Sequence, residues 1–336
     1  MSKPLVTVAI PTLTAGPKLA ECLAALEKQK FDDFDVCVID NSGWQAAREA
    51  AARWRGVEVI ENRENVGFGA AVNQACRRSS ARFLATLNDD TVPDPGWLAG
   101  LVQALEMYPE AGMCASQVRL AGGTLDSAGM LISSDATSKQ RGHGQAPEKY
   151  AAAAEVLLPS GCAALYRRKM LDEVGLFDEA FFLYCEDTDL GLRGRWAGWT
   201  CRYAPEAVVE HRYSQTAGAV SQLKAYFVER NRLFVLIKDF PPGLVARSPA
   251  AAAARYFWHL LSAMSGETSA AARYRENASV LELGYVAARA HAVLVKHARR
   301  LLRQRREIQR RARVTAREFE DLLARHFISP REVALL

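Results

Sequence analysis

Short apolar runs rich in β-branched residues alternate with helical patterns through the first half of the 336-residue chain. This alternation is typical of a parallel sheet whose strands are joined by crossover helices. We therefore predict an α/β fold. The expected strands are residues 6–12, 35–40, 57–62, 81–87, 113–120 and 156–168. The expected helices are residues 17–30, 44–55 and 97–107, with a further helix that opens near residue 66.

Beyond residue 220 the hydrophobic pattern becomes entirely helical. We therefore expect an α/β domain over residues 1–215 and a mainly helical C-terminal region over residues 216–336. Residues 133–155 form a polar stretch without a clear period, and a loop of this length in a compact domain is usually functional or disordered. This stretch is our candidate for a lid or for an element that recognises a substrate.

No secretory signal is expected, because the apolar run at the N-terminus is too short for one. The apolar segment 251–264 is also too short to cross a bilayer, and Arg255 and His259 interrupt it. Seven cysteines occur without any C-x-x-C spacing, which argues against a disulfide framework and against a zinc site. We expect a cytoplasmic protein.

The net charge of +5 is unevenly distributed, because residues 289–317 contain ten Arg and one Lys against a single Glu. Apolar residues recur within this segment, which predicts a basic amphipathic helix. Three interpretations remain open. In the first, the helix packs on its own domain or pairs with a second chain, giving a homo-oligomer. In the second, it docks on an anionic membrane surface, which would make this a peripheral membrane protein. In the third, it binds nucleic acid, which we do not expect because no nucleic-acid-binding fold accompanies the charge.

Asn88, Asp89 and Asp90 follow directly on the expected strand 81–87. Such residues are common in turns, so a purely structural role is one interpretation. The other is a metal site, because a hard divalent cation such as Mn²⁺ takes carboxylate oxygens and tolerates an imidazole. His211 ends a later apolar run, and the fold could bring it to Asp90.

A second group of acids, Glu186, Asp187 and Asp189, stands in the expected first turn of a helix and follows the aromatic run FFLY. Acids at a helix N-terminus complement the helix dipole, yet a carboxylate beside aromatic residues could also serve as a general base. Gly67 and Gly69 lie in a strand-to-helix turn, where they either allow the backbone to approach an anion or simply permit close packing.

Taken together, these stretches resemble a family 2 glycosyltransferase of the GT-A fold. The resemblance covers roughly residues 5–240 and is closest to bacterial rhamnosyltransferase-like enzymes of surface-polysaccharide assembly. The matching elements, in the order of the family, are IPT (10–12), VIDN (38–41), ENVGFGAAVN (64–73), LNDDTVPDPGWL (87–98), the long element 160–199 and EHRYS (210–214).

The resemblance implies a role for each matching residue. Asp90 would be a metal ligand for Mn²⁺ or Mg²⁺, His211 would contact the metal and the diphosphate, and Asp187 would be the catalytic base with Glu186 beside it. Asn88 departs from the first Asp of the usual D-x-D motif. The residues expected to bind the nucleotide are Pro11, Thr12, Asp40, Asn65, Gly69, Asn88 and Asp89.

The implied reaction moves a sugar from a UDP- or dTDP-linked donor, with dTDP-rhamnose as one candidate, to a saccharide or a polyprenyl-diphosphate-linked saccharide. One base opposite the leaving group implies inversion. A sugar-phosphate nucleotidyltransferase would need a Gly- and Arg-rich loop after the first strand, where this chain has PTLTAGPKLAE. An inactive saccharide-binding or scaffolding protein would be expected to lack Asp90 or Asp187. Residues 221–240 should pack on the catalytic domain, with Arg230 and Arg232 facing the phosphates.

Overall fold

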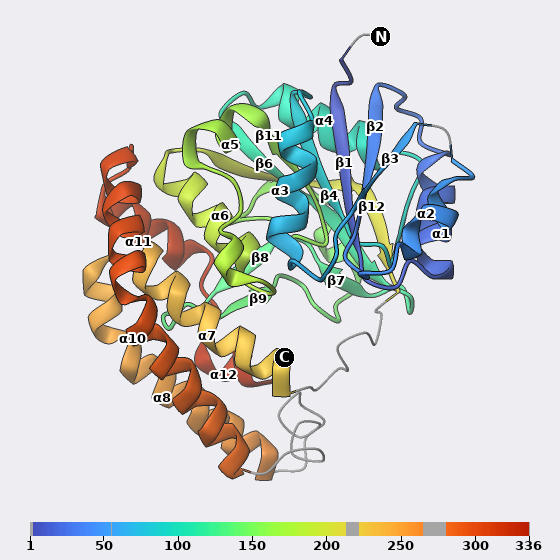
Figure 1. Cartoon of the computed structure of the whole chain (residues 1–336). Coiled ribbons are helices and arrows are strands. Elements are labelled where there is room, and N and C mark those ends of the chain that lie inside the picture. Colours follow the sequence, from blue (N-terminus) through green and yellow to red (C-terminus); the bar gives the residue numbers. More distant parts are fainter. Residues whose placement is uncertain (1–2, 55, 213–221, 265–279, 336) are drawn as a thin grey trace. The chain divides into compact units, whose positions relative to one another are not determined.

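The computed structural model describes residues 3–54, 56–212, 222–264 and 280–335 (Figure 1). Its contacts divide the chain into two compact units. The α/β unit comprises residues 1–130, 140–194 and 198–213, and the helical unit comprises residues 131–139, 195–197 and 214–336. The boundary expected near residue 215 lies outside the described residues.

The α/β unit is built on one sheet with the strand order β10-β12-β6-β11-β4-β1-β2-β3. The strands are β1 (Val6–Thr12), β2 (Phe34–Asp40), β3 (Val57–Glu61), β4 (Phe83–Leu87), β5 (Thr91–Pro93), β6 (Ala111–Leu120), β7 (Leu125–Ser127), β10 (Ala154–Glu155), β11 (Ala163–Arg167) and β12 (Thr200–His211). Strands β1 to β4 run parallel, and β11 is antiparallel to both β4 and β6, while β12 is parallel to β6. The C-terminal ends of β1, β2, β4, β6 and β12 therefore meet at one edge of the sheet.

Helices cover both faces of this sheet (Figure 1). One face carries α1 (Pro17–Leu26), α2 (Ala46–Ala51) and α4 (Trp97–Met107), and the other carries α3 (Phe68–Arg78), α5 (Arg168–Val174) and α6 (Glu186–Trp196). Two 3₁₀ turns, η1 (Pro147–Tyr150) and η2 (Glu179–Phe181), lie in the connections.

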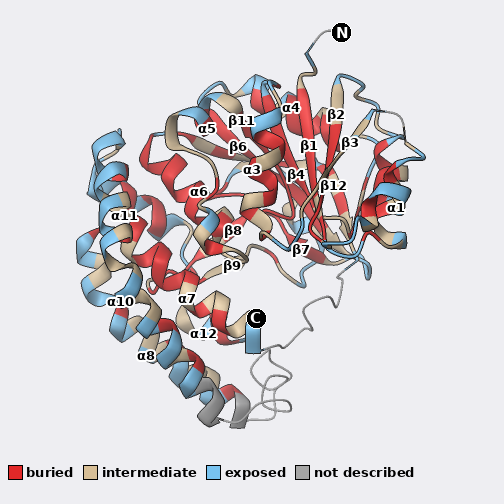
Figure 2. Ribbon diagram, viewed as in Figure 1, coloured by how far each residue is buried: buried red, intermediate tan, exposed pale blue. Residues whose placement is uncertain are grey.

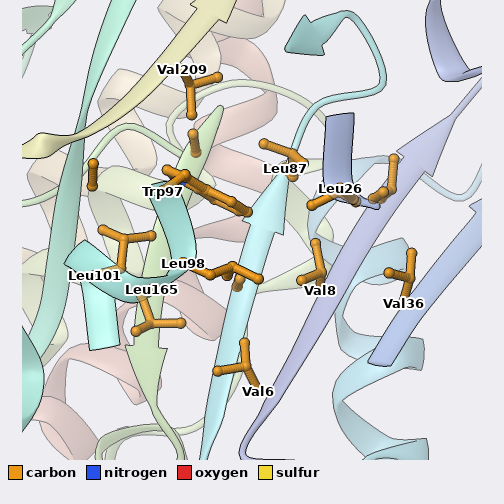
Figure 3. Close-up of a cluster of buried hydrophobic side chains, with 14 of the residues drawn as sticks. Val6, Val8, Leu26, Val36, Leu87, Trp97, Leu98, Leu101, Leu165 and Val209 are labelled. Carbon is orange, nitrogen blue, oxygen red and sulfur yellow. The ribbon is translucent and has the colours of Figure 1, made fainter. Parts of the chain in front are cut away.

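The core on the first face is formed by alternate residues of the strands. Val6 and Val8 of β1 and Leu165 of β11 pack against Trp97 and Leu98 of α4, and none of the five is exposed (Figure 3). The alternation arises because successive strand residues point to opposite faces of the sheet. The expected α/β architecture is confirmed.

The helical unit contains α7 (Gln222–Asp239), α8 (Pro242–Met264), α10 (Val280–Arg311), α11 (Ala316–Arg325) and α12 (Pro330–Leu335). Helix α10 packs along α7, and α12 packs on α8. The buried side of α10 includes Val286, Ala290, Leu301 and Ile308, whereas Leu302 is 47% exposed. Figure 2 shows the mixture of buried and exposed residues along these helices. In the described part of the chain, no helix has the length and hydropathy of a membrane span.

The basic segment is shorter as a helix than we expected. Helix α10 ends at Arg311 rather than at Arg317, because Thr315 caps a new helix. The Thr315 side chain accepts a hydrogen bond from Glu318 N, and the Glu318 carboxylate accepts one from Thr315 N, which forms a capping box.

Two expectations for the middle of the chain are corrected. Only Ala163–Arg167 of the predicted strand 156–168 is a strand, because Pro159 has no N–H for a ladder and the chain turns at Gly161. Residues 133–155 are not an irregular loop. They include β9 (Ser138–Gln140), which pairs with β8 (Met130–Ile132), as well as η1 and β10.

Buried ion pairs hold the helical unit together. Arg255 Nε lies 2.7 Å from Asp135 Oδ2 and Arg255 Nη2 lies 3.0 Å from Glu229 Oε2. Arg232 pairs with the same Glu229, and its Nη1 donates to Asp135 O at 2.6 Å. Because the Arg232 side chain is only 3% exposed and bound on both sides, the expectation that it faces phosphates is wrong. Arg230 instead lies over the rings of Tyr226, Phe227 and Phe234.

Candidate active site

The turn after β4 is fixed to two other strands. Asn88 N donates to Cys162 O at 2.9 Å, and Thr91 Oγ1 donates to Asn88 O at 2.6 Å. Strand β5 then pairs with the end of β12, so that Thr91 lies opposite His211 and Arg212 N donates to Asp90 O at 2.9 Å. Asn88–Asp90 is thus a turn, and the same turn carries Asp90 to the end of β12.

Asp90 and His211 come into direct contact, as the sequence led us to expect. Asp90 Oδ1 lies 3.3 Å from His211 Nε2. The other ring nitrogen, Nδ1, lies 2.8 Å from Asp126 Oδ2 of β7, and Asp126 Oδ1 lies 3.2 Å from His143 Nδ1. Asp90 and Asp126 are almost entirely buried, with side chains 6% and 5% exposed. The four side chains therefore form a continuous acid–imidazole chain.

The electrostatics of the acid–imidazole chain follow from burial and from contacts between its members. Burial alone would raise the pKa of Asp126, but hydrogen bonds from His143 and His211 lower it to about 2. Burial alone would lower the pKa of His211, but contacts with Cys162, Asp126 and Asp90 raise it above its ordinary value. Burial raises the pKa of Cys162, so its thiol is neutral and the two carboxylates supply the attraction. Without a cation, the two carboxylates therefore favour the protonated form of His211.

The donor atoms of Asp90 and His211 suit a hard divalent cation. Their separation of 3.3 Å is close to the edge of about 3 Å between adjacent ligands of an octahedral ion with bonds of about 2.1 Å. Within the described residues, no group of three or more His, Cys, Asp or Glu side chains could hold a metal by itself. The pair therefore fits an ion of the kind that takes one or two protein ligands and completes its shell with phosphate oxygens and water.

The second acid cluster begins α6, as expected, with Glu186, Asp187 and Asp189 in the first turn. Asp187 Oδ2 accepts from Gly161 N at 2.8 Å, and Oδ1 accepts from Thr188 N at 2.6 Å. Asp187 keeps some exposure, whereas Glu186 is 6% exposed. Burial is the main cause that raises the pKa of both, and the charge of Asp187 raises that of Glu186 further. Both carboxyl groups therefore hold a proton more strongly than usual, Glu186 the more so, and Asp187 is the more exposed residue of the two.

One short segment joins the two clusters. Gly161 N binds Asp187, and the next residue, Cys162, accepts the hydrogen bond from Asn88 N through its carbonyl oxygen. A Cβ at Gly161 would lie 3.3 Å from Asp187 Cβ and 3.4 Å from Phe68 Cε1, so glycine allows this close approach. The fold thus joins the candidate base and the turn that carries Asp90 to the same short segment, residues 160–162.

The expected nucleotide residues at the ends of β1 and β2 lie at the same edge of the sheet. Thr12 Oγ1 donates to Asp89 Oδ2 at 2.6 Å, which ties β1 to the turn after β4. Thr12 pairs in register with Asp40, and Pro11 is its partly exposed neighbour. Both oxygens of Asp40 accept backbone hydrogen bonds, from Ser42 N at 2.8 Å and Ala47 N at 2.7 Å. This contact shapes the start of α2, whatever else Asp40 binds.

The glycine turn before α3 contacts the chain itself. Asn65 Oδ1 accepts from Gly67 N at 2.9 Å, and Phe68 N donates to Phe182 O at 2.8 Å. A Cβ at Gly67 would lie 2.4 Å from Phe182 O, and one at Gly69 would lie 2.9 Å from Phe177 Cβ. Both glycines therefore permit close packing in the structure. Phe182 O accepts a hydrogen bond from a backbone N–H at the N-terminus of α3.

Two features of the site were missed in the sequence. Asp126 and His143 complete the acid–imidazole chain, yet β7 has only three residues, too few for a readable period. Before α6, Phe182, Tyr184 and Cys185 adopt φ of 65°, 68° and 64°, a conformation that bulky residues rarely adopt. Such strain clusters at functional sites, and no sequence pattern predicts it.

Comparison with known proteins identifies the family and the fold of this chain. The model of the family described as "Glycosyl transferase family 2" matches residues 7–175, half of the chain. The N-acetylglucosaminyl-diphospho-decaprenol L-rhamnosyltransferase of Mycobacterium tuberculosis is 29% identical over 247 residues, which are 65% of this chain and 79% of that protein.

Solved structures show the same fold at low identity. GalNAc-T7 with UDP, GalNAc and Mn²⁺ is 15% identical with a TM-score of 0.61 over 75% of this chain, and the chain spans about half, 51%, of its length. A mannosyltransferase from Pyrobaculum calidifontis in complex with GDP-Man and Mn²⁺ is 18% identical with a TM-score of 0.55, over 92% of this chain and 86% of that one. The expected GT-A fold with an additional helical region is confirmed.

Proposed function

The chain belongs to glycosyltransferase family 2, and from this premise we propose that it is an inverting, metal-dependent transferase whose site is the edge of the sheet formed by Asp90, His211 and Asp187. The observation that carries the proposal is that residues 160–162 bind the Asp187 carboxylate on one side and the turn of Asp90 on the other. A transferase of this kind needs a cation at the leaving diphosphate and a base at the acceptor hydroxyl.

Each residue has a distinct task in this proposal. Asp90 and His211 would hold the cation, which when bound neutralises the charge that develops on the departing diphosphate. Asp187 would accept the proton of the attacking hydroxyl, and the fixed hydrogen bonds to Gly161 and Thr188 orient it. A single base on the side of the sugar opposite to the leaving group would support direct displacement with inversion. Glu186, the other catalytic candidate of this cluster, would remain a neutral neighbour.

The substrates are proposed from the relatives. The rhamnosyltransferase named above acts on a diphospho-decaprenol-linked N-acetylglucosamine, which supports a polyprenyl-diphosphate-linked saccharide as acceptor. Because that relative transfers L-rhamnose, a rhamnose donor is supported, and we propose dTDP-rhamnose with a UDP-sugar as the alternative. Thr12, Asp40, Asp89 and their neighbours at the ends of β1 and β2 would form the nucleotide side of the site, within the proposed catalytic domain of residues 1–215.

Isothermal titration of UDP and of dTDP, each with Mn²⁺, with Mg²⁺ and with EDTA, tests the proposal. We expect one nucleotide to bind in a metal-dependent manner, and Asp90→Ala to weaken this binding by at least about tenfold, or 1.4 kcal/mol. Asp94→Ala is the matched control, because it removes an exposed carboxylate from the same segment. Binding that is indifferent to EDTA and to Asp90→Ala would remove the basis of the proposal.

The exposed face of α10 supports a peripheral location at a membrane. We call the residues Lys296, Arg299, Arg303, Arg306 and Arg310 the cationic stripe; they recur every three or four residues and are all exposed. The opposite side of α10 packs on α7, and Arg305 Nη1 donates to Ile237 O at 2.8 Å, so the stripe is not needed for the core. Each such cation adds about 1 kcal/mol of attraction to an anionic lipid surface, where a lipid-linked acceptor would reside.

A further inference from the structure

The buried carboxylate of Asp126 has no task in the reaction described so far, although it touches one of its groups. It is the central residue of β7, which pairs with β6 at the edge of the site. Asp126 Oδ2 lies 2.8 Å from His211 Nδ1, on the side of the ring opposite to Asp90. An ionised carboxylate can only accept hydrogen bonds, so His211 Nδ1 carries the proton of this contact.

This contact decides what the other ring nitrogen can do. When Nδ1 holds a proton in a neutral imidazole, the lone pair is on Nε2, and Nε2 is the atom that lies 3.3 Å from Asp90 Oδ1. Asp126 therefore selects the tautomer that can bind a cation beside Asp90, and it also fixes the plane of the ring. Carboxylate partners of metal-binding histidines commonly have this effect.

His143 holds Asp126 in turn. Its Nδ1 lies 3.2 Å from Asp126 Oδ1 and 3.2 Å from Asp126 O. The loop that carries His143 is tied to β7, because Gly144 N donates to Leu125 O and Leu125 N donates to Gln145 O, both at 2.8 Å. Gly142 and Gly144 have φ of 79° and 73°, so the loop turns back on both sides of the histidine. The imidazole is thereby directed to a carboxylate that is only 5% exposed.

We propose that Asp126 is a positioning residue for His211 and that His143 is a positioning residue for Asp126, so that residues 140–145 support the cation site rather than act as a lid. This inference rests on the proposed function, because it assumes that His211 is a ligand. Asp90 and His211 would hold the cation, and the contacts of Asp126 and His143 would set its affinity.

The test measures Mn²⁺ affinity of the full chain by electron paramagnetic resonance of free Mn²⁺, in the presence of UDP or dTDP, whichever the wild type binds. Asp126→Asn keeps the shape but turns one oxygen into an amide that opposes one of the two N–H groups. We expect Mn²⁺ to bind about 10- to 100-fold more weakly. His143→Ala is expected to weaken binding by a smaller factor, and because His143 is 30% exposed this variant should fold.

The control is Asp135→Asn, which also removes a buried, ion-paired carboxylate but lies in the helical unit. It is expected to lower the melting temperature without changing Mn²⁺ affinity. In turnover, Asp126→Asn should raise the Mn²⁺ concentration needed for half-maximal activity and recover kcat at saturating Mn²⁺, which loss of stability alone would not produce.

Two outcomes separate the proposals. If the wild type binds nucleotide without any dependence on Mn²⁺, the metal-dependent function itself fails. If the wild type binds Mn²⁺ and both Asp126→Asn and His143→Ala bind it within about twofold of the wild type, less than about 0.5 kcal/mol, only the positioning roles are refuted.

Discussion

Replacing Asp187 with Asn should separate binding from chemistry. In the wild type both carboxylate oxygens accept backbone hydrogen bonds, from Gly161 N at 2.8 Å and Thr188 N at 2.6 Å. The amide introduced by Asp187→Asn can accept only one of them, and its NH₂ group then faces the other N–H. Losing that bond costs about 1–3 kcal/mol of stability, and removing a partly buried charge offsets part of it. The variant should therefore fold.

The expected loss of activity is larger than the loss of stability. A general base contributes about 10²- to 10⁴-fold to rate, which is about 3 to 5.5 kcal/mol. Because the base acts only in the transition state, kcat and kcat/KM should fall together while nucleotide affinity with Mn²⁺ stays the same. Single-turnover release of the nucleoside diphosphate measures the loss of rate, and calorimetry measures the nucleotide affinity.

Glu186→Gln is the discriminating control, because it changes the adjacent carboxyl group. Burial raises the pKa of Glu186 well above its ordinary value, so the glutamine resembles the neutral acid already present. We expect kcat within about threefold of the wild type, less than about 0.7 kcal/mol. A hundredfold loss in Glu186→Gln together with near-normal turnover in Asp187→Asn would show that the two roles have been assigned in the wrong order.

The pH dependence should follow the same assignment. Burial raises the pKa of Asp187, so its carboxylate takes up a proton at a higher pH than an ordinary Asp, which titrates near 3.9. As the pH falls through that raised pKa, wild-type kcat/KM should decline, because the protonated acid cannot act as a base. The residual activity of Asp187→Asn should lack this acidic limb.

Further predictions concern stability and location. The Glu229 carboxyl is buried, but contacts with Arg232 lower its pKa from 4.5 to about 2. Its stabilising effect is therefore present above pH 4.5 and is lost as the pH falls toward 2. Glu229→Gln should lower the free energy of unfolding in urea by about 3–5 kcal/mol at pH 7, and by progressively less in acid. Gly67→Ala should lower the free energy of unfolding by at least about 1–3 kcal/mol, because φ is 87° and ψ is 168° and the new Cβ would meet a carbonyl oxygen 2.4 Å away. Equal melting temperatures of the variant and the wild type would contradict this. Replacing three arginines of the cationic stripe with Glu should abolish sedimentation with anionic vesicles at low salt, whereas a wild type that binds neutral vesicles or RNA equally well would refute the lipid proposal.

Much of the candidate site was readable in the sequence, because the relevant signals are local. Strand ends are visible as the last residues of apolar runs, and in a parallel sheet those ends meet at one edge. Asn88–Asp90 and His211 could therefore be paired from the sequence alone. The acids of α6 were equally visible, since the apolar spacing of Leu190, Leu192 and Trp196 indicated the start of the helix.

Other features depend on contacts between residues far apart in the chain, and no local pattern encodes them. Asp126 meets His211 across 85 positions, and Asp135 meets Arg255 across 120. The expectation for Arg232 was wrong for this reason: the sequence shows a cation on a helix, but only the packed structure shows the buried acids that bind it.

The sequence by itself determined the α/β alternation, the helical C-terminal region and the identity of the carboxylates at the strand ends, because periodicity and turn chemistry act over a few residues. Only the tertiary structure decided which of two adjacent acids is the more deeply buried, which nitrogen of His211 faces Asp90 and which side of α10 is buried. Those properties depend on burial and on the direction of individual hydrogen bonds, and both exist only once distant segments pack together.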